Sequence, residues 1–100
     1  MPYSVTVLPH ASADVHSILK ETGLHNLAYS LQLELQIRSF FSSLEQQPFV
    51  GGIIKSSRHG DLREYFVPPY RVYFTVNELT EEVRVSRVIH YKRRPPRSPE

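Results

Sequence analysis

Near its C-terminus the chain places a histidine and a tyrosine among cations. Residues 87–96 read RVIHYKRRPP, so His90 and Tyr91 stand between Arg87 and a basic run that begins at Lys92. An imidazole titrates near neutral pH and can donate or accept a proton, whereas a guanidinium binds phosphate oxygens through paired hydrogen bonds. These residue types predict either a site that binds a phosphate or the solvated start of a tail.

Basic character belongs to the C-terminal half of the chain. The sequence has 12 Lys and Arg against 10 Asp and Glu, and only two of the cations, Lys20 and Arg38, precede position 55. A localised cationic patch attracts polyanions, and its usual partners are nucleic acids and acidic protein segments. We therefore expect a partner of one of these two kinds.

The composition excludes several classes of site. No cysteine is present, so a disulfide framework, a thiolate zinc site and a cysteine nucleophile are ruled out. The histidines outside the basic segment, His10, His16, His25 and His59, lack the spacing of metal ligands, and we expect neither a metal nor another cofactor. The N-terminus has no cationic start followed by a long apolar run, and no apolar segment is long enough to span a membrane. A cytoplasmic protein without membrane contact is expected.

Hydrophobic periodicity and turn residues predict the elements that must position the basic side chains. Two helices are expected at 11–23 and 26–46, and strands at 3–8, 62–67, 70–76 and 83–91. Residues 48–60 are predicted to be a loop with a possible short strand at Ile53 and Ile54. The order βααβββ predicts an α+β domain of two layers, with a helical hairpin on one face of an antiparallel sheet. This single domain should span residues 1–94, and the proline-rich residues 95–100 should form a disordered tail.

Alternation along the strand at 70–76 separates two faces of the sheet. Val72, Phe74 and Val76 should face the helices, which leaves Arg71 and Tyr73 on the opposite, open face. An arginine fixed in the middle of a strand is well placed to hold an anion.

Arg87 breaks the alternation of the last strand, because it would point into the apolar layer. An extra residue near Val88 would repair the pattern, so we predict a β-bulge there that turns Arg87 outward together with His90. The expected open face consists of Arg63, Tyr65, Arg71, Tyr73, Arg87, His90 and Tyr91, edged by Lys55, Arg58, Lys92 and Arg93.

The second helix carries two apolar stripes. Leu27, Leu31 and Leu35 lie on one side, whereas Leu33 and Ile37 begin a second stripe that is rotated around the helix axis. Either the first helix covers the first stripe and the sheet covers the second, or one stripe is left for a partner.

Three segments of the chain resemble toxins of the RelE/ParE superfamily. The segments DLREYFVPPYRVYFTV and VRVSRVIHYKRR are similar to the C-terminal half of these toxins, and YSVTVLPHASADVHSILK is similar to their opening strand and first helix. The resemblance covers about residues 3–94. It implies a small basic toxin that is neutralised by a cognate antitoxin, which we expect to be acidic and amphipathic.

The resemblance implies one of two activities on one fold. RelE-like members cut mRNA in the ribosome without a metal, and ParE-like members poison DNA gyrase. In the ribonuclease branch, the arginine after the tyrosine stabilises phosphate charge, which falls on Arg71, and a terminal His-Tyr pair performs acid/base chemistry, which falls on His90 and Tyr91.

Cleavage of RNA by its own 2′-hydroxyl needs a base, an acid and a cation that holds the phosphate. His90 could serve as acid or base, Arg71 and Arg87 as the phosphate clamp, and the tyrosines of the open face as stacking platforms for bases. Glu64 is a weak candidate base, because its parity points it inward.

The sequence differs from the RelE-like pattern in the strand before the tyrosine and arginine, where Arg63 stands in place of paired lysines. A metal-independent, ribosome-dependent endoribonuclease acting on mRNA is the preferred hypothesis. The alternatives are a non-catalytic inhibitor of DNA gyrase and an inactive RNA-binding or structural domain.

Overall fold

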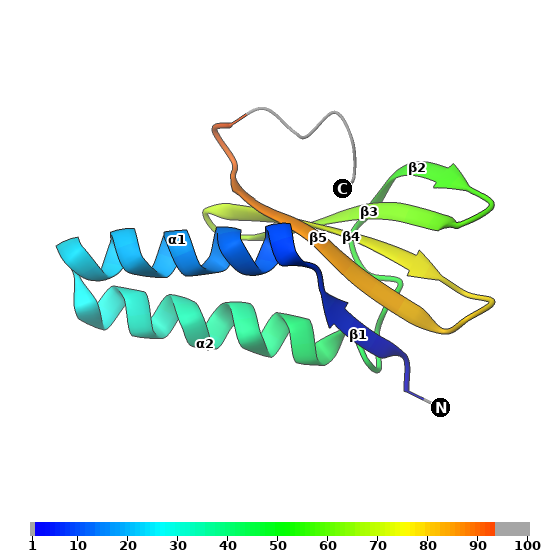
Figure 1. The fold of residues 1–100 in the computed structure, drawn as a ribbon, viewed down its shortest axis with the longest axis horizontal. Coiled ribbons are helices and arrows are strands. Elements are labelled where there is room, and N and C mark those ends of the chain that lie inside the picture. Colours follow the sequence, from blue (N-terminus) through cyan, green and yellow to red (C-terminus); the bar gives the residue numbers. More distant parts are fainter. Residues whose placement is uncertain (1, 94–100) are drawn as a thin grey trace.

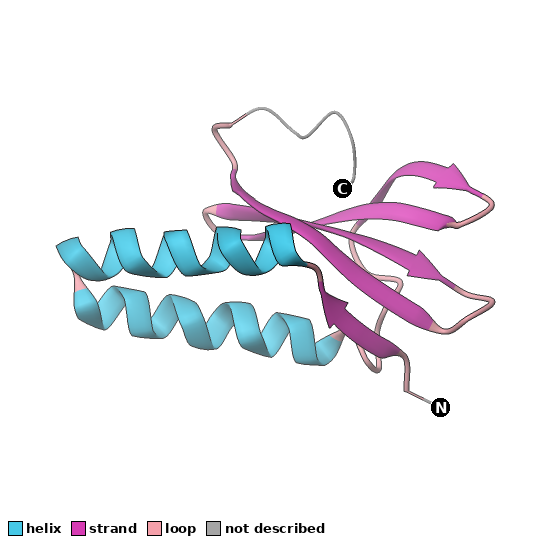
Figure 2. Cartoon of the chain, in the orientation of Figure 1, coloured by secondary structure: helices cyan, strands magenta, loops and turns pink. Residues whose placement is uncertain are grey.

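The computed structural model describes residues 2–93 and forms an α+β fold of two layers. Two helices pack on one face of the sheet, as the sequence predicts, but the sheet has five strands and not the predicted four (Figures 1 and 2). The elements are β1 (Ser4–Val7), α1 (Pro9–His25), α2 (Leu27–Ser43), β2 (Gly52–Ser57), β3 (Gly60–Val67), β4 (Tyr70–Asn77) and β5 (Glu82–His90). The predicted tail at 95–100 lies outside the described residues.

The sheet has the strand order β1-β5-β4-β3-β2, in which β1 pairs parallel to β5 and all other pairs are antiparallel. The predicted loop at 48–60 is wrong, because β2 is a complete edge strand paired with β3. Its Gly-Gly and Ser-Ser pairs resemble turn signals in the sequence. Pairing with β3, and not local preference, makes this segment extended.

Gly51 allows β2 to approach β3. Its φ of 78° lies in the left-handed region, and a Cβ at this position would collide with the carbonyl oxygen of Glu64. Only glycine satisfies both conditions without strain.

Each helix of the hairpin begins with an identifiable residue. Pro9 occupies the first turn of α1, where its missing N–H costs nothing. Asn26 caps α2 by accepting a hydrogen bond from the backbone N–H of Tyr29 at 3.0 Å. Gly23 does not end α1, contrary to the prediction, because the helix continues to His25; Gly23 lies opposite Ser30 of α2.

The core lies between α2 and the central strands. Leu33, Ile37 and Leu44 are fully buried against β4, whose Val72 and Phe74 are also inaccessible to solvent. The predicted orientation of β4 is therefore confirmed. The other stripe of α2 is not covered by α1, because its leucines remain more than half exposed.

A β-bulge is present in β5, but it lies at Ser86 and not at Val88. The pairing shifts from Phe74 with Val85 to Tyr73 with Arg87, which leaves Ser86 as the extra residue. The Ser86 hydroxyl donates to the carbonyl oxygen of Tyr73 at 3.1 Å and so holds the bulge in place.

Substitution of Gly51 by alanine should destabilise the protein. We expect the free energy of unfolding to fall by about 1–3 kcal/mol, because the new Cβ meets both a left-handed backbone and the Glu64 carbonyl. Gly52→Ala is the matched control, since nothing lies within 4 Å of its Cβ position. Chemical denaturation measures both, and equal stabilities of the two variants would contradict this account of β2.

Candidate functional site

Strand pairing defines the open face of the sheet, the face that the helices do not cover. Paired residues of antiparallel strands point to the same side, so this face can be read from the register. The open face carries Lys55 on β2, Leu62, Glu64 and Phe66 on β3, Arg71, Tyr73 and Thr75 on β4, and Arg84, Arg87 and Ile89 on β5.

Arg71 lies on the open face as predicted, and it is accompanied by a carboxylate. Its Nη1 atom lies 3.8 Å from Oε2 of Glu64, and both side chains are partly exposed. The predicted inward orientation of Glu64 is wrong, because Glu64 pairs with Tyr73 on this face. Glu64 is thus a candidate functional residue that the parity argument missed, and it partly neutralises Arg71.

Tyr73 forms the floor next to this ion pair. Its side chain is on the open face as predicted, yet only 2 % of it is accessible. Burial raises the pKa of the Tyr73 phenol above its ordinary value of 10.0, and the nearby Glu64 carboxylate raises it further, with Arg71 acting in the opposite direction. Tyr73 therefore presents a neutral hydroxyl.

An aromatic pair borders Arg71 at one end of the open face. The rings of Phe66 and Tyr91 meet edge to face with centroids 6.2 Å apart, and Lys92 Nζ lies 5.8 Å from the Tyr91 ring. Arg71, Glu64 and Tyr91 share a hollow of about 560 Å³. Tyr91 and Arg71 are therefore brought together, in agreement with the predicted site.

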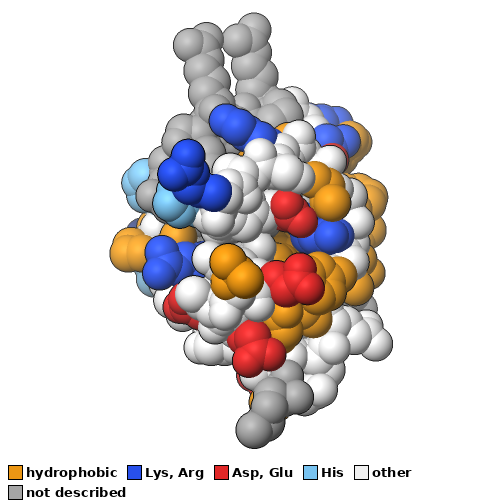
Figure 3. Space-filling model, turned by 90° about the vertical axis from the view of Figure 1, so that its right-hand side faces the viewer, with side chains coloured by type: hydrophobic (Ala, Val, Ile, Leu, Met, Phe, Trp, Pro, Cys, Tyr) orange, Lys and Arg blue, Asp and Glu red, His pale blue; other side chains and the backbone are white. Residues whose placement is uncertain are grey.

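At the other end of the open face, one cation comes from β2 and another comes from β5. A transverse row runs from Lys55 on β2 through Leu62 and Thr75 to Arg84 on β5. These residues line a second hollow of about 550 Å³ together with His59. Viewed toward the turns that join β2 to β3 and β4 to β5, most of the basic side chains lie in the upper part and most of the acidic ones lower down (Figure 3). Arg58 lies exposed in the turn between β2 and β3.

His90 does not join Arg71 on the open face. It pairs with Tyr70, whose ring belongs to the core on the helix side and lies 5.5 Å from the imidazole, whereas Arg71 pairs with Ile89. The prediction that Arg71 and His90 reach a common anion is wrong. The reason is the alternation of the strand: the one extra residue at Ser86 reverses every later residue, so Arg87 turns outward and His90 turns to the helix side.

A groove of about 980 Å³ surrounds His90 on the helix side. Helix α1 and the start of α2 form one wall, and the end of β5 forms the other. Among the predicted site residues, it brings His90 together with Lys92, Arg93 and the edge of Arg87. None of these four residues lines the hollow that contains Arg71.

Arg63 and Tyr65 are also on the helix side, contrary to the prediction. Arg63 is buried, and its Nη1 donates to the carbonyl oxygens of Phe49 and Val50 at 3.1 and 3.3 Å. The Tyr65 ring stacks on Phe40 of α2 at 4.4 Å. Arg63 pairs with Phe74 and Tyr65 pairs with Val72, so both side chains point to the helix side like their partners on β4. Arg63 therefore holds the loop before β2, and Tyr65 covers the core.

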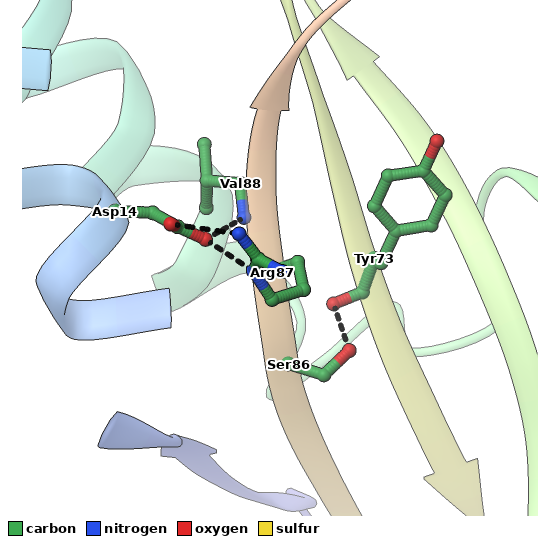
Figure 4. Close-up of polar contacts among 5 residues, drawn as sticks. All are labelled: Asp14, Tyr73, Ser86, Arg87 and Val88. Carbon is green, nitrogen blue, oxygen red and sulfur yellow. Dashed lines mark hydrogen bonds and ion pairs between the residues drawn. The ribbon is translucent and has the colours of Figure 1, made fainter. Parts of the chain in front are cut away.

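The guanidinium of Arg87 is held by Asp14 of α1 (Figure 4). Its Nε and Nη2 donate to the Asp14 carboxylate at 2.8 and 3.2 Å, and the backbone N–H of Val88 donates to the same carboxylate at 2.9 Å. The hydrogen bonds that Arg87 donates to Asp14 raise the pKa of Arg87. No local pattern of residues indicates this pair, because its partners are 73 residues apart in the sequence. The Arg87 guanidinium is therefore already hydrogen-bonded within the protein, and its role as a phosphate clamp stays a prediction.

Within residues 2–93, no group of three His, Cys, Asp or Glu side chains is arranged to hold a metal ion. Neither described helix has the length and apolar character of a membrane span.

Comparison with known proteins identifies the class and then the family. The fold is similar to that of a chain in a chromosomal ParDE toxin-antitoxin system from P. aeruginosa, with a TM-score of 0.69 and 17% identity over 88% of this chain and 95% of that one. It is also similar to that of a chain in the RelBE2 toxin-antitoxin complex from Mycobacterium tuberculosis, with a TM-score of 0.59 and 20% identity over 90% and 99% of the two chains.

The family model for the ParE toxin of the type II toxin-antitoxin system parDE matches residues 5–95. The chain therefore belongs to the ParE toxin family, within the RelE/ParE superfamily that the sequence resembles. No curated protein sequence matches it.

Removal of the Asp14 carboxylate should destabilise the fold. Asp14→Ala leaves the Arg87 guanidinium and the Val88 N–H without their acceptor, so we expect a loss of about 2–4 kcal/mol in the free energy of unfolding. Glu34→Ala is the control, because it removes an exposed ion pair with Arg38 on α2 and should cost under about 1 kcal/mol. Similar losses in urea denaturation would argue against a special role for Asp14.

The stability of the protein should depend on Tyr73 at alkaline pH. Because the pKa of Tyr73 is raised in the folded state, the unfolded chain loses its phenolic proton first. The contribution to stability is complete below pH 10.0 and is lost as pH rises through the higher folded pKa. Tyr73→Phe should show a smaller decline in unfolding free energy above this pH than the wild-type chain; identical declines would contradict the assignment.

Proposed function

We propose that this toxin acts as a ParE-like inhibitor of DNA gyrase, by binding and without chemistry of its own, in the cytoplasm. The observation that carries the proposal is the separation of Arg71 and His90 onto opposite faces of the sheet. A ribonuclease needs its acid, base and phosphate-binding cation within reach of one phosphate. The match of nearly the whole chain to the ParE family model supports the same choice.

The engagement of Arg87 adds to this argument. Its two hydrogen bonds to Asp14 occupy the fork that would bind a phosphate, and breaking them would expose a half-buried ion pair. A phosphate ligand would therefore compete with a carboxylate that the fold itself needs.

The open face offers a surface for protein contacts. Lys55, Arg58, Arg84 and Lys92 project from it or from its rim, and Phe66 and Tyr91 provide an exposed aromatic edge. Aromatic residues and arginines are the usual anchors of protein interfaces. The cations fit an acidic antitoxin, which would cover this face and prevent the toxin from reaching its target.

One observation favours a ribosome-dependent endoribonuclease as the second candidate. Glu64, Arg71 and Tyr91 surround one hollow on the open face, so a carboxylate base, a phosphate-binding cation and a base-stacking ring lie together without His90. In this candidate the mRNA would lie across the open face, and the residues of the helix-side groove would have no part in the reaction.

Growth arrest in a bacterial host separates these candidates. On induction of the toxin without its antitoxin, we expect covalent gyrase–DNA complexes, with no mRNA ends mapped inside codons. Glu64→Gln and His90→Gln should each retain growth arrest to within about threefold, because neither removes a reacting group. Each variant must retain the wild-type thermal transition.

Two results would contradict the proposal that the toxin inhibits DNA gyrase by binding alone. Cleavage inside codons that is lost in Glu64→Gln but kept in His90→Gln would establish the ribonuclease of the open face. Cleavage that is lost in His90→Gln would restore the site predicted from the sequence.

A further inference from the structure

Helix α2 presents a stripe of leucines to solvent. Leu27, Leu31 and Leu35 are 65%, 55% and 68% exposed, although the opposite side of the same helix is buried in the core. Leu24, at the end of α1, is 79% exposed beside the hairpin turn. Apolar residues concentrated in this way usually mark an interaction surface, whereas scattered exposed leucines do not.

We propose that the leucine stripe of α2 (Leu27, Leu31 and Leu35) binds the same stripe of a second copy of this chain, forming a two-fold symmetric dimer. The three leucines are spaced evenly at four-residue intervals, so the stripe is symmetric about Leu31. When two such helices pack antiparallel with the two-fold axis at Leu31, each Leu27 meets Leu35 of the second copy and Leu31 meets itself. The surface is therefore complementary to itself, as a two-fold interface requires.

The charges beside the stripe are compatible with this pairing. Glu34 and Arg38 form an ion pair within the helix at 3.0 Å, so neither needs a charged partner. About an axis at Leu31, Glu34 lies opposite the small Ala28 of the second copy and not opposite its Glu34. The acidic antitoxin, in contrast, is suited to the cations that gather in the C-terminal half of the chain.

The size of the surface sets the expected strength of the dimer. At these exposures, the three leucines with Leu24 supply roughly 400 Å² per protomer, about half of the ~800 Å² that each partner buries in a standard interface. Flanking Ala28, Gln32 and Ser39 would supply part of the remainder. We expect a reversible dimer that dissociates on dilution and leaves the open face accessible.

Sedimentation of the purified full chain across the micromolar range tests the dimer. The wild-type chain should shift from monomer to dimer as its concentration rises. Leu31→Glu and Leu31→Lys should each be monomeric at every concentration, because each places two like charges together at the two-fold axis. An equimolar mixture of the two variants should dimerise again, since the introduced charges are then opposite.

Leu79→Glu is the matched control, because Leu79 is 91% exposed in the turn between β4 and β5 and should leave the dimer unchanged. Circular dichroism melting verifies that the variants remain folded. A wild-type chain that stays monomeric overturns the proposal, as does a dimer that survives both charged substitutions. A mixture that fails to dimerise also overturns it. If the wild-type chain is monomeric and Leu31→Glu loses its antitoxin, the stripe belongs to the antitoxin and the proposal is wrong.

Discussion

The hydrogen bonds of the Asp14 carboxylate join the helical layer of this toxin to the sheet. They lie just beyond the point where β1 stops pairing with β5. Strand β1 pairs with β5 only as far as Val85, and beyond it the edge of β5 would leave the Val88 N–H without a partner. Asp14, from the helix that follows β1, accepts that N–H and both donors of Arg87. A partly buried cation and an edge amide are thus satisfied by one group, which fixes α1 against β5.

The bulge at Ser86 decides which basic side chains share a face of the sheet. Before the bulge, β5 alternates with Val83 and Val85 toward the core; after it, Val88 resumes that role. This one extra residue sends Arg87 outward and His90 to the helix side. A strand has a side-chain period of two, so a single extra residue reverses the direction of every residue that follows it.

The charge of the surface is also less uniform than the composition indicates. Arg71 lies beside Glu64, Arg84 beside Glu82 and Arg87 beside Asp14, so three cations of the C-terminal half have carboxylates close by. Within residues 2–93, Lys55, Arg58, Lys92 and Arg93 are further exposed cations at the rim. Such a surface suits recognition of a protein with its own charge pattern, whereas a nucleic acid backbone favours a continuous cationic track.

Local patterns in the sequence determined much of this structure: the helical hairpin, strands β3 to β5, and the direction of Val72, Phe74 and Val76 all follow from periodicities of a few residues. Only the tertiary structure decided the rest. β2 is a strand because β3 pairs with it, Arg63 is buried because β4 sets the direction of β3, and Arg87 is engaged because α1 returns Asp14 to it across 73 residues. Residue types alone placed the bulge two residues from its actual position, and they did not show that one extra residue reverses His90 as well as Arg87. Register is set by pairing between strands, which no single segment of sequence contains.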